Sequence, residues 1–157
     1  MKINKNEVLK ISLTLASILV VAVLGSIFVN LGMEWYETLI KPSQWINNIV
    51  IPIVWTVIYL TFAIILSIWI SKDYNIPKII TVLLIMNGVF NVLWCFIFFT
   101  LRLTFLGNVV IILNLILSYW LIFEIKKVKP TYALILNIYP IWISIATTLN
   151  TAIWILN

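Results

Sequence analysis

Five apolar segments of about 20 residues each dominate this sequence. They cover residues 8–29, 49–70, 79–99, 106–125 and 132–155. The hydrocarbon core of a bilayer is about 30 Å thick and needs roughly 20 apolar residues in each helix that crosses it. Hydrocarbon offers backbone N–H and C=O groups no partner, and the segments are continuous rather than alternating, so we expect helices. The predicted fold is an all-α integral membrane bundle of five transmembrane helices.

The composition points to the same class of protein. Apolar residues make up 64% of the chain and charged residues 10%, whereas soluble domains carry roughly 45–50% and about 25%. Five spans leave little chain for a soluble appendage, so we expect one domain over residues 1–157. The chain has no histidine, and its one cysteine is Cys95. We therefore expect no intrachain disulfide, no imidazole ligand and no metal site.

The lysines predict an orientation in the membrane. Most lie at the amino-terminal side of the predicted bundle: Lys2, Lys5, Lys10, Lys72, Lys78, Lys126, Lys127 and Lys129. Only Lys41 and Arg102 lie at the other side. The positive-inside rule then places the amino terminus in the cytoplasm and the carboxyl terminus outside. We expect a bacterial cytoplasmic membrane, with an organellar membrane as the alternative, and no nucleic-acid partner for the net charge of +5.

The connection over residues 30–48 is the longest one, and the orientation above places it outside. The later connections are short, so consecutive helices should be antiparallel neighbours. A long connection in a compact bundle usually either has a function or is disordered. Trp35, Trp45 and the pair Lys41 and Pro42 favour an ordered one, because tryptophan has a large apolar surface to bury. We expect this connection to close a ligand pocket.

Tryptophans and asparagines lie deep in the predicted spans. Trp55, Trp94 and Trp142 each carry an indole N–H that needs a partner, and lipid provides none. Asn87, Asn91 and Trp94 are spaced four and three apart and so share one helix face. Such amides can simply hold helices together, at about 0.6 to 2 kcal/mol each. Because these groups gather below the long connection, we expect instead a cavity for a flat, mostly apolar ligand.

Several motifs carry a family resemblance. They are W-Y-x-x-L-x-K-P at residues 35–42, P-x-x-W-T at residues 52–56, N-x-x-F-N-x-x-W at residues 87–94, Arg102, and Y-x-x-W-x-x-x-A-T-x-L-N-x-x-I-W at residues 139–154. Together they resemble the translocator protein family, also called the TspO or mitochondrial benzodiazepine receptor family. The resemblance implies a five-helix bundle, often dimeric, that binds tetrapyrroles such as protoporphyrin IX. Animal members also bind cholesterol and synthetic drugs of the benzodiazepine and isoquinoline carboxamide types.

The resemblance also implies which residues line the pocket. Trp55, Asn91, Trp142 and Ala146 match lining positions of the family. Further lining positions are matched by Tyr36, Pro42, Tyr59, Trp94 and Leu149. No cofactor is implied, since the tetrapyrrole is the ligand.

Three departures from the family pattern bear on the pocket. After Ser43 the family usually continues W-T-P-P, whereas here residues 44–47 read Q-W-I-N, which alters the predicted lid. In the fifth span the family's P-Y-x-x-W has become Y-P-x-W, so the kink from Pro140 should move by about two residues. The animal cholesterol motif is absent, because Thr151 and Ile155 stand at its tyrosine and basic positions.

Two functions remain open, together with a purely structural alternative. The first is a membrane receptor, sensor or carrier for porphyrins and other flat lipophilic molecules. The second is an enzyme that degrades protoporphyrin IX oxidatively in light, as reported for some bacterial members of the family. Its catalytic residues would be Trp55, aided by Trp142, as electron donors or radical sites beside the bound ring. A conventional acid–base enzyme or ion-coupled transporter is disfavoured, since no ionisable Asp, Glu, Lys, Arg or His lies at mid-membrane depth.

The structural alternative is a membrane protein that only dimerises. Ala22 and Ser26 form a small-xxx-small pair on the first predicted helix, with Gly25 beside them. Small residues at this spacing let two helices pack closely in lipid. A homodimer is therefore an expected partner, alongside the bilayer and the lipophilic ligand.

Overall fold

The computed structural model describes residues 5–42, 49–73 and 75–157. These residues form helices and no strand. The helices are α1 (Lys5–Thr38), α2 (Val50–Asp73), α3 (Lys78–Cys95), the π-helix η1 (Phe96–Thr100), α4 (Thr104–Val128), α5 (Pro130–Leu136) and α6 (Ile138–Leu156). Five stretches are long and apolar enough to cross a membrane, with α3 joined to η1 and α5 joined to α6. The prediction of an all-α bundle with five membrane-spanning helices is confirmed.

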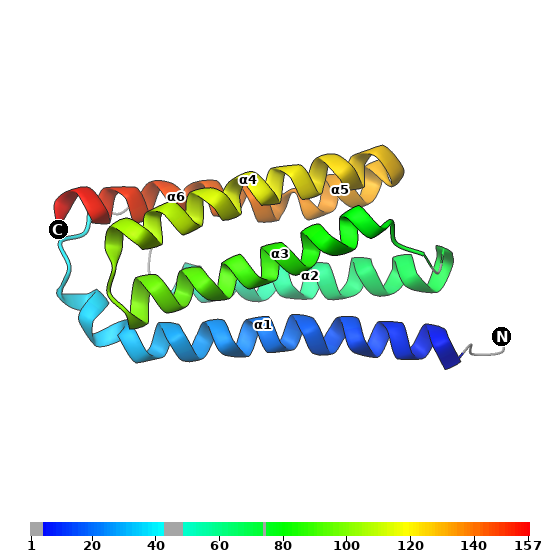
Figure 1. The fold of residues 1–157 in the computed structure, drawn as a ribbon, viewed down its shortest axis with the longest axis horizontal. Coiled ribbons are helices and arrows are strands. Elements are labelled where there is room, and N and C mark those ends of the chain that lie inside the picture. Colours follow the sequence, from blue (N-terminus) through cyan, green and yellow to red (C-terminus); the bar gives the residue numbers. More distant parts are fainter. Residues whose placement is uncertain (1–4, 43–48, 74) are drawn as a thin grey trace.

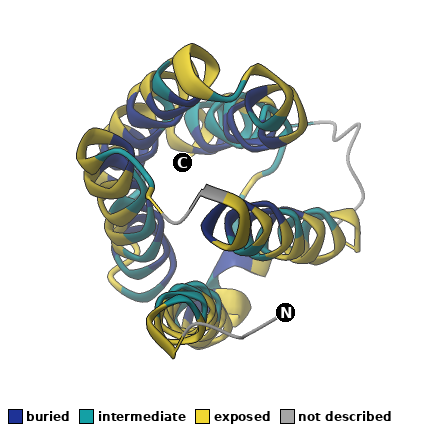
Figure 2. Ribbon diagram, turned by 90° about the vertical axis from the view of Figure 1, so that its right-hand side faces the viewer, coloured by how far each residue is buried: buried dark blue, intermediate teal, exposed yellow. Residues whose placement is uncertain are grey.

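The helices lie side by side along the long axis of the molecule (Figure 1). Going round the bundle, α1 packs on α2, α2 on α5 and α6, α6 on α4, α4 on α3, and α3 again on α1. The prediction that consecutive helices are neighbours is wrong for α2 and α3, because among the described residues both pack on α1 rather than on each other. Figure 2 shows this ring end-on, with the buried faces turned inward. The connection from α1 to α2 and the carboxyl terminus lie at one end, and the α2–α3 connection lies at the other with the amino terminus.

The first helix is longer than predicted. The expected span ended at residue 29 and its connection began at residue 30, whereas α1 continues to Thr38. Glu34 and Glu37 end the apolar pattern, but glutamate is a good helix former, so the loss of hydropathy does not end the helix. Tyr36 is buried on this last stretch and contacts the rings of Phe98 and Phe99 at 6.3 and 5.4 Å.

Glycines set how closely α1 approaches its neighbours. The buried residues of α1 are Gly25, Gly32 and Tyr36. A Cβ at Gly25 would lie 3.6 Å from the sulfur of Cys95, but a Cβ at Gly32 would lie only 2.1 Å from the carbonyl oxygen of Phe99. Gly32 therefore places the backbones of α1 and η1 in direct contact.

The small-xxx-small pair lies beside this face. Ala22 is half-buried and Ser26 is exposed. Gly25, next to them, packs within the chain against Cys95. The pair itself contributes no buried side chain to α1 among the described residues, and the dimer stays a prediction.

The third span ends in a π-helix followed by a left-handed residue. The N–H of Leu101 donates to the carbonyl of Phe96 at 2.9 Å, and the N–H of Leu103 donates to that of Ile97 at 3.1 Å. Between them Arg102 has φ of 60°, the conformation that glycine usually supplies after a helix. The turn into α4 therefore depends on a strained arginine backbone.

Replacing Arg102 tests this strain. Arg102→Gly should leave the free energy of unfolding within about 1 kcal/mol or raise it, because glycine adopts positive φ freely. Arg102→Val should lower it by about 1 to 2 kcal/mol, because a left-handed conformation is unfavourable for a residue with a Cβ and most so for a β-branched one. Unfolding by a denaturing detergent measures both, and equal stability of the two variants would contradict the explanation.

The fifth span is interrupted at Asn137, as the proline predicts. Pro140 has no N–H to donate to the carbonyl of Leu136, which ends α5. The helix resumes as α6, with the N–H of Ile141 donating to the carbonyl of Asn137 at 3.3 Å. Trp142 follows within the first turns of α6 and is buried.

The chain after α1 is held at the carboxyl-terminal end of α6. The side-chain amide of Asn157 accepts a hydrogen bond from the N–H of Ile40 at 2.9 Å and donates one to its carbonyl at 3.0 Å. The ammonium of Lys41 lies 4.4 Å from the ring centre of Tyr36. The altered lid sequence, including Trp45, lies outside the described residues.

Candidate ligand-binding site

A cavity of about 1440 Å³ lies between α1, α2 and α3. It exceeds the roughly 300 to 1,000 Å³ of a site for a drug-sized ligand, so it has room for a large polycyclic one. It extends from Trp55 and Asn91 to Lys10 and Lys78. The two lysines lie toward the end of the bundle where the α2–α3 connection turns (Figure 1). Most of the wall between is aliphatic.

Aromatic side chains form one wall of the cavity. Trp55 and Tyr59 are four residues apart on α2, so their rings share a face and stack, with centroids 5.7 Å apart and planes 26° apart. Trp55 also contacts Tyr139 of α6 edge-on at 6.4 Å. Phe62 packs on Tyr139 at 5.6 Å. All four line the cavity, and such rings offer stacking faces to a flat ligand.

Two amides on α3 give this wall its polar groups. Asn91 accepts a hydrogen bond from the Tyr59 hydroxyl at 3.3 Å, and Asn87 donates one to the carbonyl of Leu83 at 2.8 Å. The remaining polar atoms, Oδ1 of Asn87 and Nδ2 of Asn91, are buried and have no hydrogen-bond partner among the described residues. A buried unpaired polar group is unfavourable by about 1 to 3 kcal/mol. A ligand that pairs with them would recover that energy.

Three of the nine predicted ligand-binding residues line this cavity: Trp55, Tyr59 and Asn91. Tyr36 and Trp94 lie outside it, in an aromatic cluster around Phe98 and Phe99. Trp94 stacks on Phe98 at 6.2 Å, and its indole N–H donates to Oδ1 of Asn150 at 3.1 Å. The structure thus gives Trp94 a partner inside the protein.

The other four predicted residues also lie away from the cavity wall. Trp142 is buried on α6, and its indole N–H has no partner among the described residues. Ala146 and Leu149 are half-buried against the core. Pro42 is half-buried in the connection after α1. No residue of 30–42, nor Ile49 or Val50, lines the cavity, so a lid and these ligand contacts remain predictions.

The structure adds cavity residues that were not in the predicted set. Asn87 was recognised as sharing a face with Asn91 but was not assigned to the pocket. Tyr139 and Phe62 follow the same helical spacing from Trp142 and Tyr59, which is the signal that could have identified them. The α1 wall, which includes Phe28, carried no signal, because α1 is apolar on every side and its sequence marks no preferred face.

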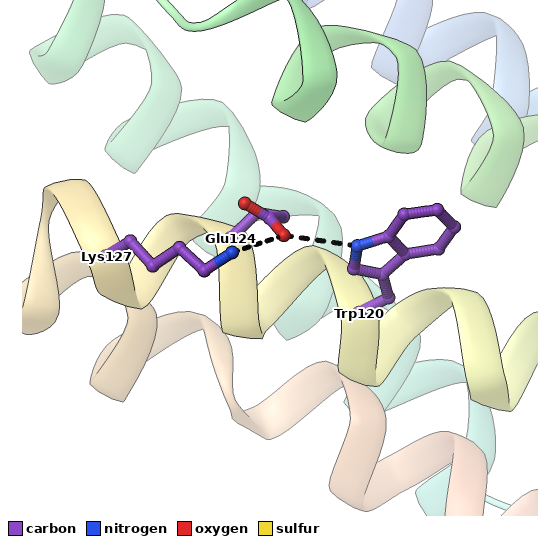
Figure 3. A network of polar contacts seen from close by, with 3 residues as sticks. All are labelled: Trp120, Glu124 and Lys127. Atoms are coloured by element: carbon purple, nitrogen blue, oxygen red, sulfur yellow. Dashed lines mark hydrogen bonds and ion pairs between the residues drawn. The ribbon is translucent and has the colours of Figure 1, made fainter.

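The acidic side chains that the structure describes lie outside the cavity wall. Glu124 is on the surface of α4, where its carboxylate accepts hydrogen bonds from Nε1 of Trp120 at 3.2 Å and Nζ of Lys127 at 2.7 Å (Figure 3). An ion pair this exposed adds little stability. Within residues 5–42, 49–73 and 75–157, no three His, Cys, Asp or Glu side chains come together as a metal site.

Comparison with known proteins agrees with the motifs. A model of the TspO/MBR family matches residues 13–155. The tryptophan-rich protein TspO of Archaeoglobus fulgidus is 30% identical over 156 residues, which cover 96% of this chain and 99% of that protein. The protein of the same name from Chlorobaculum tepidum is 27% identical over 157 residues, covering 96% and 98%. That from Bacillus cereus is 28% identical over 134 residues, covering 85% and 87%.

The family match spans most of α1 and every later helix, so it includes the three helices around the cavity. The resemblance drawn from the motifs is therefore confirmed, and the five apolar helices make the chain an integral membrane protein. This chain belongs to the TspO/MBR family.

Proposed function

We propose that this protein is a membrane receptor, sensor or carrier that binds porphyrins such as protoporphyrin IX, and other flat lipophilic molecules. The ligand occupies the cavity between α1, α2 and α3. The observation that carries the proposal is the stacked pair Trp55 and Tyr59 on the cavity wall, beside the unpaired amide of Asn91. Ligand sites are mostly apolar and aromatic, with a few polar groups that orient the ligand.

The first connection and the membrane orientation belong to the same proposal. We propose that the connection closes the end of the bundle nearer Trp55. The two hydrogen bonds between the backbone of Ile40 and the side chain of Asn157 support this, because they fix the start of the connection at that end. The lysine-rich end, where Lys10 and Lys78 line the cavity, faces the cytoplasm of a bacterial cell. The homodimer is proposed without an assigned interface, and cross-linking in bilayers tests it.

A titration of the purified protein with protoporphyrin IX in the dark tests the binding proposal. Saturable quenching of tryptophan fluorescence is expected, because Trp55 lies on the cavity wall. Trp55→Phe should remove a large part of the quenching, whereas Trp154→Phe should not, since Trp154 does not line the cavity. Quenching that never saturates, in the parent and in both variants, would refute specific binding.

Asn91 should contribute to affinity directly. Asn91→Leu should weaken the binding of a carbonyl-bearing ligand by about 1 to 3 kcal/mol, because it removes a buried donor and the acceptor of Tyr59. Asn150→Leu is the matched control: it breaks the hydrogen bond to Trp94 outside the cavity, so it should lower stability and leave affinity unchanged. Unchanged affinity in Asn91→Leu would mean that this amide only joins α3 to α2.

A second function is favoured by one observation. Trp55 contacts both Tyr59 and Tyr139, so an oxidisable indole on the cavity wall is in contact with two phenols. This arrangement supports light-dependent oxidative degradation of protoporphyrin IX with dioxygen as the oxidant. Trp55 would act as an electron donor or radical site beside the light-excited ring, and the electrons removed from the porphyrin would reduce dioxygen. Trp142, the other predicted donor, does not line the cavity. Illumination of the loaded protein separates this function from binding alone.

A further inference from the structure

Among the described residues, the charged side chains that line the cavity are those of two lysines. Lys10 lies on the second turn of α1, and Lys78 is the first residue of α3. Asn75 and Thr81 lie beside them, while no Asp or Glu is found among the cavity's described lining residues. Asn75 and Lys78 are exposed, so these four residues form a polar, positively charged end of the cavity at the protein surface, which we call the lysine mouth. The rest of the cavity is apolar apart from its hydroxyls and the amides of Asn87 and Asn91.

The surroundings strengthen the attraction of this opening for anions. A cationic opening onto a low-dielectric cavity focuses the electric field and attracts anionic groups. Long lysine stems can lie along apolar helix surfaces while their ammonium groups reach the membrane interface. The first turn of α3 adds a further positive contribution, because Pro77 caps it with no side-chain hydrogen bond, which leaves backbone N–H groups open.

The inner part of the cavity disfavours an anion. Its unpaired atoms are Oδ1 of Asn87, an acceptor that would repel a carboxylate, and Nδ2 of Asn91, a single neutral donor, and the described lining residues place no cation beside them. Removing an ionised carboxylate from water into an apolar site is strongly unfavourable unless a cation pairs with it. A ligand with an apolar edge and an anionic edge therefore has one favourable orientation in the cavity, with its anionic edge at the lysine mouth.

We infer that the lysine mouth binds the carboxylates of a flat, dianionic tetrapyrrole, whose apolar edge points inward to Trp55 and Asn91. This inference rests on the proposed function and adds the ligand's charged group, its direction and the two residues that select it. Asn87 is nine residues beyond Lys78 on α3, or about 14 Å at 1.5 Å per residue. That distance suits a tetrapyrrole whose carboxylate arms reach the mouth while its ring lies beside the amides.

The test compares protoporphyrin IX with its dimethyl ester, which keeps the ring and lacks both charges. Affinities are measured in neutral detergent at low ionic strength for the parent, Lys10→Gln, Lys78→Gln and the double variant. In the parent the free acid should bind about tenfold more tightly or better, as expected for charge-assisted hydrogen bonds. The preference should fall in each single variant and vanish in the double variant. Comparing variants cancels any difference in how the two porphyrins partition into micelles.

Lys126→Gln is the matched control, because Lys126 is an exposed lysine of α4, lies at the same end of the bundle and does not line the cavity. It should keep the full preference for the acid. Equal affinity for acid and ester in the parent, or an unchanged preference in the double variant, would overturn the inference while porphyrin binding stands. Absence of binding by either porphyrin would instead refute the proposed function.

Anionic lipid is the competing occupant of the lysine mouth. In nanodiscs, the double variant should retain phosphatidylglycerol as well as the parent does, because the mouth is proposed to take the porphyrin carboxylates. Loss of phosphatidylglycerol in the double variant, with both porphyrin affinities unchanged, would show that the mouth binds lipid headgroups and would overturn the inference.

Discussion

Gly32→Ala should separate α1 from η1 and lower the free energy of unfolding by about 3 kcal/mol or more. The added Cβ would lie 2.1 Å from the carbonyl oxygen of Phe99 and 2.4 Å from its carbonyl carbon. Both are backbone atoms, so no side chain can rotate away to relieve the overlap. Overpacking usually lowers stability by 1 to 3 kcal/mol, and a backbone clash belongs at the upper end. Unfolding by a denaturing detergent, followed by tryptophan fluorescence, measures the loss.

Gly25→Ala is the matched control on the same face of the same helix. Its Cβ would lie 3.6 Å from the sulfur of Cys95, an ordinary contact distance. Alanine is also the better helix former, so this variant should be as stable as the parent or more so. If both variants lose the same stability, the close approach of α1 to η1 at Gly32 is not what joins these helices.

Trp55→Phe should abolish any light-dependent loss of porphyrin absorbance while keeping most of the affinity. Phenylalanine retains an apolar ring for stacking on Tyr59, but it is much harder to oxidise than indole. Tyr59 and Tyr139 contact the ring at position 55 and would remain in place. The measurement is the rate of porphyrin loss under illumination, with the affinity measured in the dark on the same sample.

Trp142→Phe is the control for this experiment. Trp142 is buried on α6 and does not line the cavity, so its replacement should leave the photochemical rate unchanged. Equal turnover by Trp55→Phe and the parent would remove Trp55 as the redox partner. A loss of turnover only in Trp142→Phe would assign the chemistry to Trp142, the second predicted donor. Turnover in neither the parent nor the variants would leave the binding function alone.

The five spans could be predicted because a backbone in lipid must pair its own hydrogen-bonding groups, and continuous apolar segments of this length do so as helices. The ends of the helices were harder to predict from the sequence. Glu34 and Glu37 mark the end of the apolar pattern, yet α1 continues to Thr38 because helix formation does not require apolar residues and Tyr36 packs on Phe99. Pro140 was a better guide, since a missing N–H affects its own helix directly.

The cavity could be predicted only in part. Spacing placed Asn87 and Asn91 on one helix face, and the family resemblance implied Trp55 and Tyr59; all four residues line the cavity. The same spacing put Trp94 on the face of these asparagines, and we therefore predicted that Trp94 lines the pocket. In the structure its indole N–H instead donates a hydrogen bond to Asn150 in the packed interior. A deep indole needs a partner, but the sequence does not state whether that partner is a ligand or another helix.

The local sequence therefore determines where the helices form, because the backbone hydrogen bonds of a helix join residues only four positions apart. Which faces meet is decided between distant segments. In lipid the outer surface of a helix is as apolar as its inner one, so hydropathy does not mark the buried side. Gly25 and Gly32 look alike in the sequence, yet only Gly32 touches a backbone, because η1 happens to pass there. Lys10 and Lys78, which are 68 positions apart, share one opening for the same reason: only the packed bundle brings α1 and α3 together around a space.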